Sequence, residues 1–567
     1  MQKYTAARAL IDVLSANGIS QIFFNPGGET APVQAAIARL RIAGKPAPEM
    51  VLCLDESVAL GAAHGSYMAS GKPQVVMVHA ELGTLQMGGA LHNAQWGRVP
   101  VVILAGYFPR GERVNWRKEP YDQGCIVRNC VKWDHDFKPG ENFSVVLQKA
   151  LDMASAEPRG PVYLYFPFFL FLEEVPKTVQ ASQTPSSKAG RRVSSGSLAR
   201  AANMLLDADK PLIILGHTGR YPETISPLIE LAETLGAPVI TSQVWMNFPT
   251  SHPLCAGIEQ FLGSRKGNPY MADADVVLAI DYTMPYALAE GVPGKGAKII
   301  HIDLEPTTQG RLLWERGADL FLKADSRELI PALIKLIQGK ITPAKRAHFR
   351  RRSREIKSEY NRLQLEWRQT GVSAARQKPI SPDWLCHCLS RVIDEETIIV
   401  HHTISHQASI TEQIQRSKPF TLIGCAAGSI SWALAAALGA KVAARDRTVI
   451  SLMTDGGFIW GCPVATLWSA KAYGAPFLTI VFNNQSYGYM KGLIKKYAGV
   501  EKVSDRMAFE AGVDIAPPPS YAMIAQACGG YGQTVESPHE VLPALRKALR
   551  QVRQGKPAVL DVVLARA

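Results

Sequence analysis

The fold is decided by RTVISLMTDG at 447–456 and FLTIVFNNQSYG at 477–488, two apolar runs that each end in polar residues. Between them, CPVATLWSAKAYGA at 462–475 has apolar residues at helical spacing and a glycine that ends the pattern. This order predicts strand, helix and a second, parallel strand, with both carboxyl ends at one edge of a sheet. Asp455 and the Asn483-Asn484 pair would then meet where open α/β sheets bind ligands.

A carboxylate beside an amide oxygen predicts a metal site. Hard oxygen donors suit magnesium or calcium, whose remaining positions are filled by phosphate oxygens and water. Taken alone, the Asp-Gly sequence that ends the first run is also typical of a solvated turn, and so is the Asn-rich sequence that ends the second run. The two pieces together, at this spacing, favour a metal–phosphate site over two unrelated turns.

Three motifs in the same order resemble those of thiamine-diphosphate enzymes. DGGF at 455–458, followed by a helix and NNQSYG, is similar to the family's diphosphate–metal motif, although Thr454 stands where a glycine is usual. GSISWALAAALGA at 428–440 resembles the segment under the thiamine ring in pyruvate decarboxylases and acetohydroxyacid synthases. ESVALGAAHGSYMASGKP at 56–73 resembles the family's glutamate helix, and HAELGTLQMGGALHNA at 79–94 is similar to a stretch of benzoylformate decarboxylase.

The resemblance implies a thiamine diphosphate whose phosphates are neutralised by Mg²⁺ or Ca²⁺. The metal ligands would be the side chains of Asp455 and Asn484 and the carbonyl of Ser486. Asn484 is preferred over Asn483 because the family uses the second asparagine of the pair. A buried diphosphate needs these partners, since several negative charges cannot be buried bare.

Other residues are expected to hold the rest of the cofactor. The amides of Gly456 and Gly457 lead into a helix and would bind phosphate oxygens at its N-terminus. Ser405 is a further phosphate candidate, with a plain turn residue as the alternative. By resemblance, the Gly428 carbonyl accepts from the cofactor's amino group and Ile430 supports its bent conformation.

Two residues are predicted to be catalytic. Glu56 would share a proton with the aminopyrimidine ring, as the family's glutamate does; Asp55 is the neighbouring alternative but lies one residue too far from GKP, and the pair could instead cap a helix. His79 ends an apolar run and occupies the position of a catalytic histidine in benzoylformate decarboxylase. An imidazole can donate and accept protons near neutral pH, and a structural strand-end histidine is the alternative.

Further pocket candidates are Gln123, His401, His402 and His406. The pair His401-His402 lies where relatives often carry an acid, and we interpret this departure as a sign of a different substrate.

Composition breaks divide the chain into three pieces. The segment 178–197 is rich in Ser, Thr and Gln, and a second break runs from a basic stretch to two prolines at 375–382. The predicted domains are 1–177 (pyrimidine-binding), 191–340 (central) and 378–567 (diphosphate-binding). Each alternates apolar runs with helical patterns, so we predict three doubly wound α/β domains with parallel sheets.

Composition excludes several classes of protein. Apolar residues make up 47% and charged residues 20% of the 567 residues, as in ordinary globular proteins. No apolar run approaches the roughly 20 residues of a membrane span, and the charged start favours the cytoplasm. The formal net charge is +13, and KRAHFRRRSREIK at 345–357 contains seven Lys or Arg residues and one His. Without a nucleic-acid module this run favours a solvated linker helix over nucleic-acid binding. The nine scattered cysteines predict reduced thiols.

These expectations combine into a magnesium-dependent enzyme that decarboxylates a 2-oxo acid. The resulting enamine is either protonated or added to a second carbonyl compound, as in acetolactate synthases. The alternatives are a degenerate, non-catalytic cofactor-binding homologue, suggested by Thr454, and a lyase or C–C hydrolase with the same cofactor. The sequence GHTG at 216–219 is too short a motif to predict a flavin (FAD) in the central domain. The resemblance also implies a homodimer or homotetramer whose active sites are shared between subunits.

Overall fold

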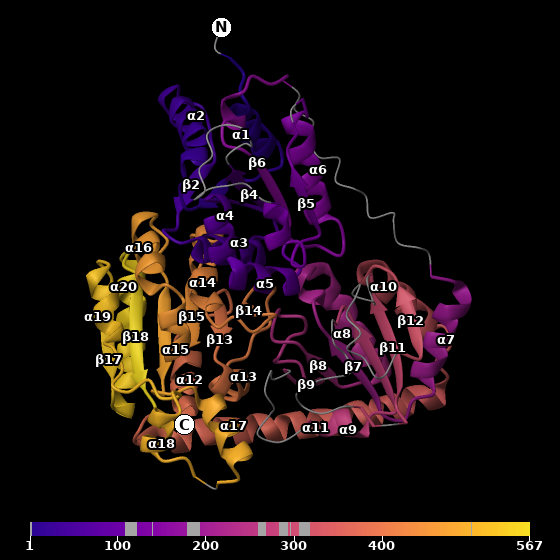
Figure 1. Ribbon diagram of the computed structural model, residues 1–567. Helices are drawn as coiled ribbons and strands as arrows, with labels where there is room; N and C mark the ends of the chain where they lie inside the picture. Colours follow the sequence, from indigo (N-terminus) through magenta and orange to yellow (C-terminus); the bar gives the residue numbers. More distant parts are fainter. Residues whose placement is uncertain are drawn as a thin grey trace.

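Three parallel sheets organise the molecule. The computed structural model describes residues 3–107, 122–138, 140–177, 193–258, 268–282, 293–294, 296–304, 318–500 and 502–566. It contains three six-stranded sheets, and every pairing between their strands is parallel. Helices cover the sheets, with the first sheet at the top of Figure 1, the third at lower left and the central one at lower right. The predicted fold class is confirmed.

The first sheet has the order β2-β1-β3-β4-β6-β5. Its central strands are apolar on both faces because helices bury both sides. The strands are β1 Gln21–Phe24, β2 Glu49–Leu52, β3 Gln74–Val78, β4 Val101–Tyr107, β5 Trp133–Asp136 and β6 Val162–Pro167, and the helices are α1 Ala6–Ala16, α2 Ala31–Ile42, α3 Glu56–Ser70, α4 Ala80–Gln86, α5 Gly88–Trp96 and α6 Phe143–Ser155.

The central sheet has the order β12-β11-β10-β7-β8-β9. Arg98 ties it to the first domain by donating to both carboxylate oxygens of Asp303, at 3.1 and 2.7 Å. The strands are β7 Pro211–Leu215, β8 Val239–Thr241, β9 Cys255–Ile258, β10 Val276–Ile280, β11 Lys298–Asp303 and β12 Leu320–Lys323, and the helices are α7 Ser195–Leu206, α8 Ile225–Leu235, α9 Pro269–Asp273 and α10 Ser326–Gln338.

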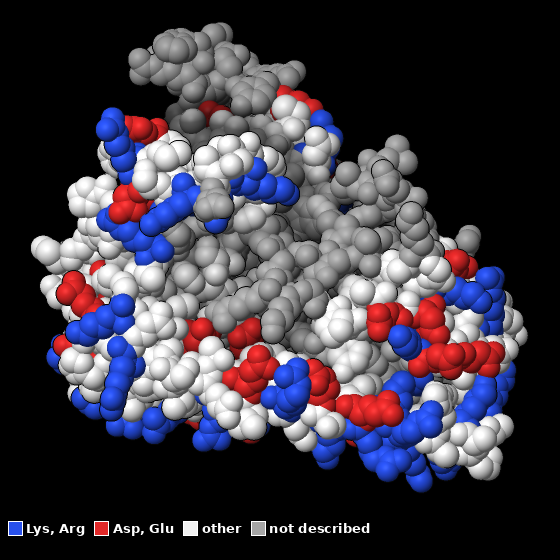
Figure 2. Space-filling model, turned by 90° about the horizontal axis from the view of Figure 1, so that it is seen from below, with Lys and Arg blue, Asp and Glu red and all other residues white. Residues whose placement is uncertain are grey.

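A single 31-residue helix, α11 Pro343–Ser373, carries the basic run and connects the central and third domains along the bottom of Figure 1. Several of its charges have acidic partners: Lys345 pairs with Asp207, and Arg362 pairs with Glu359 and Glu366. Figure 2 shows blue and red side chains interspersed on this face. The run is therefore part of a long connecting helix with mixed surface charge.

The third sheet has the order β14-β13-β15-β16-β18-β17 and contains the strand–helix–strand unit predicted from 447–488. The strands are β13 Ile398–His402, β14 Leu422–Gly424, β15 Val449–Thr454, β16 Leu478–Asn483, β17 Tyr531–Val535 and β18 Ala558–Val563. The helices are α12 Pro382–Ser390, α13 Gln407–Gln413, α14 Trp432–Ala443, α15 Asp455–Trp460, α16 Pro463–Ala472, α17 Gly488–Ala498, α18 Asp505–Glu510, α19 Tyr521–Ala527 and α20 Val541–Arg553.

Glycines allow α3 of the first domain to contact α14 of the third domain. A Cβ atom built on Gly65 would lie 1.9 Å from the Ala436 carbonyl oxygen, and one on Gly439 would lie 1.7 Å from the Ala62 carbonyl oxygen. Real Cβ atoms do not approach backbone oxygens this closely, so the two helices require glycine at these positions. The contact fixes the first domain on the third.

We expect Gly439→Ala to lower the free energy of unfolding by about 3 kcal/mol or more, because the added methyl group must push two backbones apart. Gly492→Ala on α17 is the matched control, since nothing lies within 4 Å of a Cβ there. Alanine should stabilise that helix by up to about 1 kcal/mol. Urea unfolding of both variants is the measurement, and equal midpoints would contradict the role of Gly439.

Three sequence expectations concern features outside the sheets. The predicted linker 178–197 lies mostly outside the described residues, and the three domain boundaries stay predictions. All nine cysteines are free thiols, as expected. Among the helices in the described parts of the chain, none is long and apolar enough to cross a bilayer.

Candidate active site

Asp455 is a buried carboxylate whose charge lacks a cationic partner among the described residues. It opens α15 directly after β15 and is 1% exposed. Its Oδ1 accepts from the Gly456 amide at 2.8 Å, whereas Oδ2 accepts no hydrogen bond of normal geometry from described groups. Burial raises the pKa of Asp455 to about 6, although the amides of Gly456, Gln485 and Ser486 face it and act in the opposite direction. A bound cation would supply the missing charge.

The turn after β16 brings amide and carbonyl oxygens to the same edge. Asn484 is buried, and its Oδ1 accepts from the Ser486 amide at 3.3 Å. Asn483 differs because its side chain donates to Asp561 on β18 at 2.8 Å. Since the Ser486 amide also faces Asp455, the structure brings Asp455, Asn484 and Ser486 together. Within the described ranges no three His, Cys, Asp or Glu side chains converge, so a metal here would rely on one carboxylate, one amide and one carbonyl.

Thr454, the departure from the usual glycine, caps α15. Its hydroxyl accepts from the Gly457 amide at 3.2 Å, which satisfies one of the free amides of the first turn. The amides of Gly456 and Gly457 thus meet side chains of Asp455 and Thr454 in this structure, and their assignment to phosphate oxygens stays a prediction.

The segment Gly428–Ser431 lies against the start of α15. A Cβ on Gly457 would be 3.0 Å from the Ile430 carbonyl oxygen, and one on Gly461 would be 3.1 Å from the Ser431 carbonyl oxygen. Among the described residues, no atom lies within 4 Å of a Cβ position on Gly428. The structure therefore brings Ile430 beside the Asp455 turn and leaves room next to Gly428.

Asp55 and Glu56, the two alternatives for the family's glutamate, have different environments. Asp55 is the N-cap of α3, and its carboxylate accepts from the amides of Ser57 and Val58. Glu56 is buried and lies against α4, where a Cβ on Gly83 would be 2.6 Å from Oε1. The cap role thus belongs to Asp55, which leaves Glu56 available for chemistry.

Glu29 is a site residue that the sequence analysis missed. It is 2% exposed, and its Oε1 accepts from the Ala80 amide at 2.9 Å and lies 2.9 Å from Nδ1 of His79. The carboxylate holds the imidazole at the carboxyl end of β3. Gly27 leaves room for the ring, since a Cβ there would lie only 2.0 Å from Nδ1. Nothing in the local pattern of PGGET marked this glutamate, since its partner is 50 residues away.

The other candidates lie in two domains, Gln123 in the first and the rest in the third. Gln123 is buried and donates to the Tyr163 hydroxyl at 2.7 Å, which also contacts Thr84 of α4 at 2.7 Å. His401 and His402 end β13 beside β15, and burial lowers the pKa of each to about 4, so both are neutral at pH 7. His406 stacks on Phe482 with ring centroids 5.6 Å apart. Ser405 is exposed in the turn Ile404–His406.

Contacts within the chain join the two sheet edges. Asn93 of α5 donates to the Ser429 carbonyl at 3.0 Å and accepts from the Ser429 amide at 3.3 Å. A cavity of about 10 Å³ lies between α3 and α14, lined in part by Ser57, Trp432 and Gly461. Glu56 and the Gly428–Ser431 segment therefore flank the same interdomain boundary. The roles of all these site residues stay predictions.

Comparisons with known proteins agree along the chain. Residues 4–126, 198–333 and 405–562 match the N-terminal TPP binding domain, the central domain and the C-terminal TPP binding domain of thiamine pyrophosphate enzymes. Similar relatives include benzoylformate decarboxylase of Pseudomonas aeruginosa, 25% identical over 98% of both chains. Acetolactate synthase isozyme 3 large subunit of Escherichia coli is 25% identical over 100% of this chain and 95% of its own.

Two further similar proteins extend the comparison. Sulfoacetaldehyde acetyltransferase of Rhodobacter capsulatus is 24% identical over 99% of this chain and 94% of its own. A solved structure, the thiamine diphosphate-dependent 4-hydroxybenzoylformate decarboxylase of Rhodococcus jostii RHA1, covers 100% of both chains with a TM-score of 0.79 and 21% identity. At that identity the structural likeness concerns the fold.

Proposed function

We propose that this chain, which belongs to the thiamine-diphosphate-dependent enzyme family, removes carbon dioxide from a 2-oxo acid with Mg²⁺ as the metal. The observation that carries this proposal is the His79–Glu29 pair, an imidazole held by a buried carboxylate at the sheet edge next to α3. Decarboxylation followed by protonation needs a proton donor, and a fixed imidazole is suited to that task.

The residues present fit the cofactor and its metal. Asp455 provides a buried carboxylate with an oxygen that no described group binds, and Asn484 and Ser486 add neutral oxygens beside it. A hard divalent cation prefers this donor set, and diphosphate oxygens would complete it. Gly428 and Ile430 would border the ring system. When bound, thiamine diphosphate supplies a nucleophilic carbon and a sink for the electrons left by carbon dioxide.

The residues that would transfer protons belong to the first domain. Glu56 would hold a proton against the cofactor's pyrimidine ring from its buried position at the start of α3. His79 would deliver a proton to the substrate-derived carbon from Nε2 while Nδ1 contacts Glu29. The carboxylate fixes the ring's orientation, as in other carboxylate–imidazole pairs.

We expect His79→Ala to slow turnover by about 10²–10⁴ while cofactor binding is unchanged, because an acid–base group is lost far from the diphosphate. Glu29→Gln should slow turnover less, since it retains the side chain's size but removes the charge facing the ring. Steady-state kinetics with calorimetric cofactor titration provide the test. Normal turnover of His79→Ala would make that histidine structural.

Two fates of the substrate-derived carbon are open to this site. Protonation gives a decarboxylase, as in the relative named benzoylformate decarboxylase, and addition to a second carbonyl compound gives a carboligase, as in the relative named acetolactate synthase. The His79–Glu29 pair favours protonation. Product analysis after incubation with 2-oxo acids is the experiment: an aldehyde supports the proposal, and a hydroxyketone as sole product would favour the carboligase.

We propose that no flavin binds the central domain. The crevice where such sheets take nucleotides lies between β7 and β10. There, a Cβ on Gly216 would lie 2.2 Å from the Asp281 carbonyl oxygen, and Arg220 pairs with the Asp281 carboxylate at 3.1 Å. Purified protein should lack absorbance near the flavin bands, and a yellow protein would contradict this.

We also propose a homodimer or a dimer of dimers with shared active sites. Large apolar side chains remain exposed in the single chain near the site: Leu82 on α4, Trp460 on α15 and Val464 on α16 are each more than half exposed, the last two at 60%. Large exposed apolar side chains close to a site favour an interaction surface there. A second copy of the chain would cover them.

A further inference from the structure

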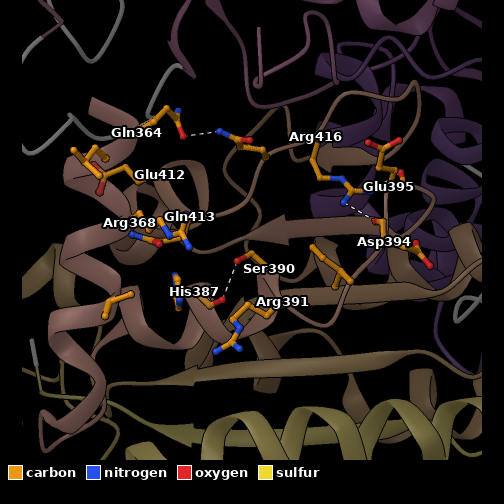
Figure 3. Close-up of a pocket in the computed structure, with 14 residues that line it drawn as sticks. Gln364, Arg368, His387, Ser390, Arg391, Asp394, Glu395, Glu412, Gln413 and Arg416 are labelled. Carbon is orange, nitrogen blue, oxygen red and sulfur yellow. Dashed lines mark hydrogen bonds between the residues drawn. The ribbon is translucent and has the colours of Figure 1, made fainter. Parts of the chain in front are cut away.

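A cavity of about 970 Å³ lies away from the candidate active site, between α11, α12 and α13 (Figure 3). This volume is at the upper end of the range typical of small-molecule sites, about 300–1,000 Å³. Its walls come from the last turns of α11, from the end of α12 with the loop to β13, and from the end of α13. None of the residues assigned to the proposed reaction lines it.

Two arginines on one side of the cavity form no ion pair with any residue that the structure describes. Figure 3 shows Arg368, His387 and Arg391 on one side, together with Glu412, and Asp394 and Glu395 on the other. Burial lowers the pKa of His387, and the charges of Arg391 and Arg368 lower it further, so both guanidiniums lie within electrostatic reach of this ring. In the part of the chain that the structure describes, neither Arg368 nor Arg391 forms an ion pair.

Three other charged residues of the lining have partners elsewhere, namely Arg416, Asp394 and Glu395. Arg416 donates to the carbonyl oxygens of Asp394 and Glu395 at 2.9 and 2.8 Å. The Asp394 carboxylate accepts from the Thr397 amide at 2.7 Å, and Glu395 lies 3.8 Å from Lys418. Glu412 on α13 is the third carboxylate of the lining, and its charge weakens the field of the Arg368 and Arg391 guanidiniums.

The α11 wall adds apolar surface next to Arg368. Leu365 and Val372 line the cavity and are 58% and 51% exposed. The three residues are spaced at i, i+3 and i+7, which places them on one face of the helix. An exposed apolar pair on either side of a free guanidinium matches a ligand that has both an anionic group and an apolar body.

We propose that this cavity binds a small organic acid, with its carboxylate between Arg368 and Arg391 and its apolar part against Leu365 and Val372. Two guanidiniums can share one carboxylate through charge-assisted hydrogen bonds. The proposal does not depend on the reaction proposed above, because no residue is common to both sites.

Hexanoate is the probe, because it combines a carboxylate with an unbranched apolar chain. The readout must be local, since the proposed active site would also accept carboxylates. Trp384 stacks on His387 with ring centroids 5.7 Å apart, so fluorine NMR of the full chain labelled with 5-fluorotryptophan reports on the cavity. The Trp384 signal is assigned with Trp384→Phe among the 10 tryptophans.

We expect hexanoate to shift the Trp384 signal saturably and hexylamine to leave it unchanged. Arg368→Gln and Arg391→Gln should each weaken binding by about tenfold or more, as expected for a lost charged hydrogen bond. Glu412→Gln should tighten hexanoate binding. Arg354→Gln, which removes an exposed arginine of α11 outside the lining, is the matched control and should leave hexanoate binding unchanged.

Two results would overturn the proposal. The first is a Trp384 signal that does not move with hexanoate in the wild-type protein, which no folding defect of a variant can explain. The second is inorganic phosphate binding as tightly as hexanoate, because that outcome removes the role of the apolar wall.

Discussion

Asp455→Ala should weaken binding of thiamine diphosphate in the presence of Mg²⁺ by at least about 100-fold. Removing a residue that only orients a metal ligand costs about 10- to 100-fold in metal affinity, and Asp455 is itself a proposed ligand. The variant removes the one carboxylate beside Asn484 and Ser486, so the metal would lose its only anionic protein ligand in the proposed set. Without the metal the diphosphate would be buried with its charge poorly neutralised. Calorimetric titration of cofactor with and without Mg²⁺ is the measurement.

Misfolding can be separated from lost binding. Burial raises the pKa of Asp455 to about 6, so its ionised form costs folding free energy at pH 7 when no cation is bound. The cofactor-free Asp455→Ala protein should therefore unfold at a temperature no lower than wild type. Asp446→Ala, which alters an exposed aspartate just before β15, is the control and should bind normally. Unchanged cofactor affinity in Asp455→Ala would remove this residue from the site.

Glu56→Ala and Asp455→Ala proteins should each be nearly inactive when made separately, but co-expression should restore activity. Glu56 belongs to the first domain and Asp455 to the third, and in the proposed dimer the two domains at one cofactor come from different subunits. A mixed dimer then has one centre with both lesions and one with neither. With random pairing, half the dimers are mixed and about a quarter of wild-type activity should return.

The opposite outcome has its own structural basis. Within a single chain α3 contacts α14 through Gly65 and Gly439, and Asn93 bonds to Ser429. If these contacts completed the centre within one chain, every centre in the mixture would carry a lesion. An inactive mixture that contains verified mixed dimers would therefore rule out the shared site.

The sheet arrangement could be predicted because its signals are local. Apolar runs such as TVISLM and FLTIVF alternate with helical patterns, and parallel pairing follows from that order alone. Strand ends also marked Asp455, Asn484 and His79 correctly as residues at carboxyl edges. The Asp55–Glu56 alternative needed the structure, since only the observed cap bonds show which carboxylate is engaged.

Two features could not be predicted because they depend on contacts between distant residues. Glu29 follows a glycine turn with no periodicity, and its importance comes from His79. Arg368 lies on α11 and Arg391 directly follows α12, and in the sequence both are typical of ordinary surface charges. Only the packing of α11 against α12 and α13 shows that they line one cavity.

Carbon dioxide release tests the central claim most directly. Protein stripped of cofactor and metal is incubated with a panel of aromatic and aliphatic 2-oxo acids, and carbon dioxide is followed before and after thiamine diphosphate and Mg²⁺ are added. The account predicts release from at least one acid only when both are present, and its loss in Asp455→Ala. A protein that binds both but releases no carbon dioxide from any acid of the panel would contradict the account.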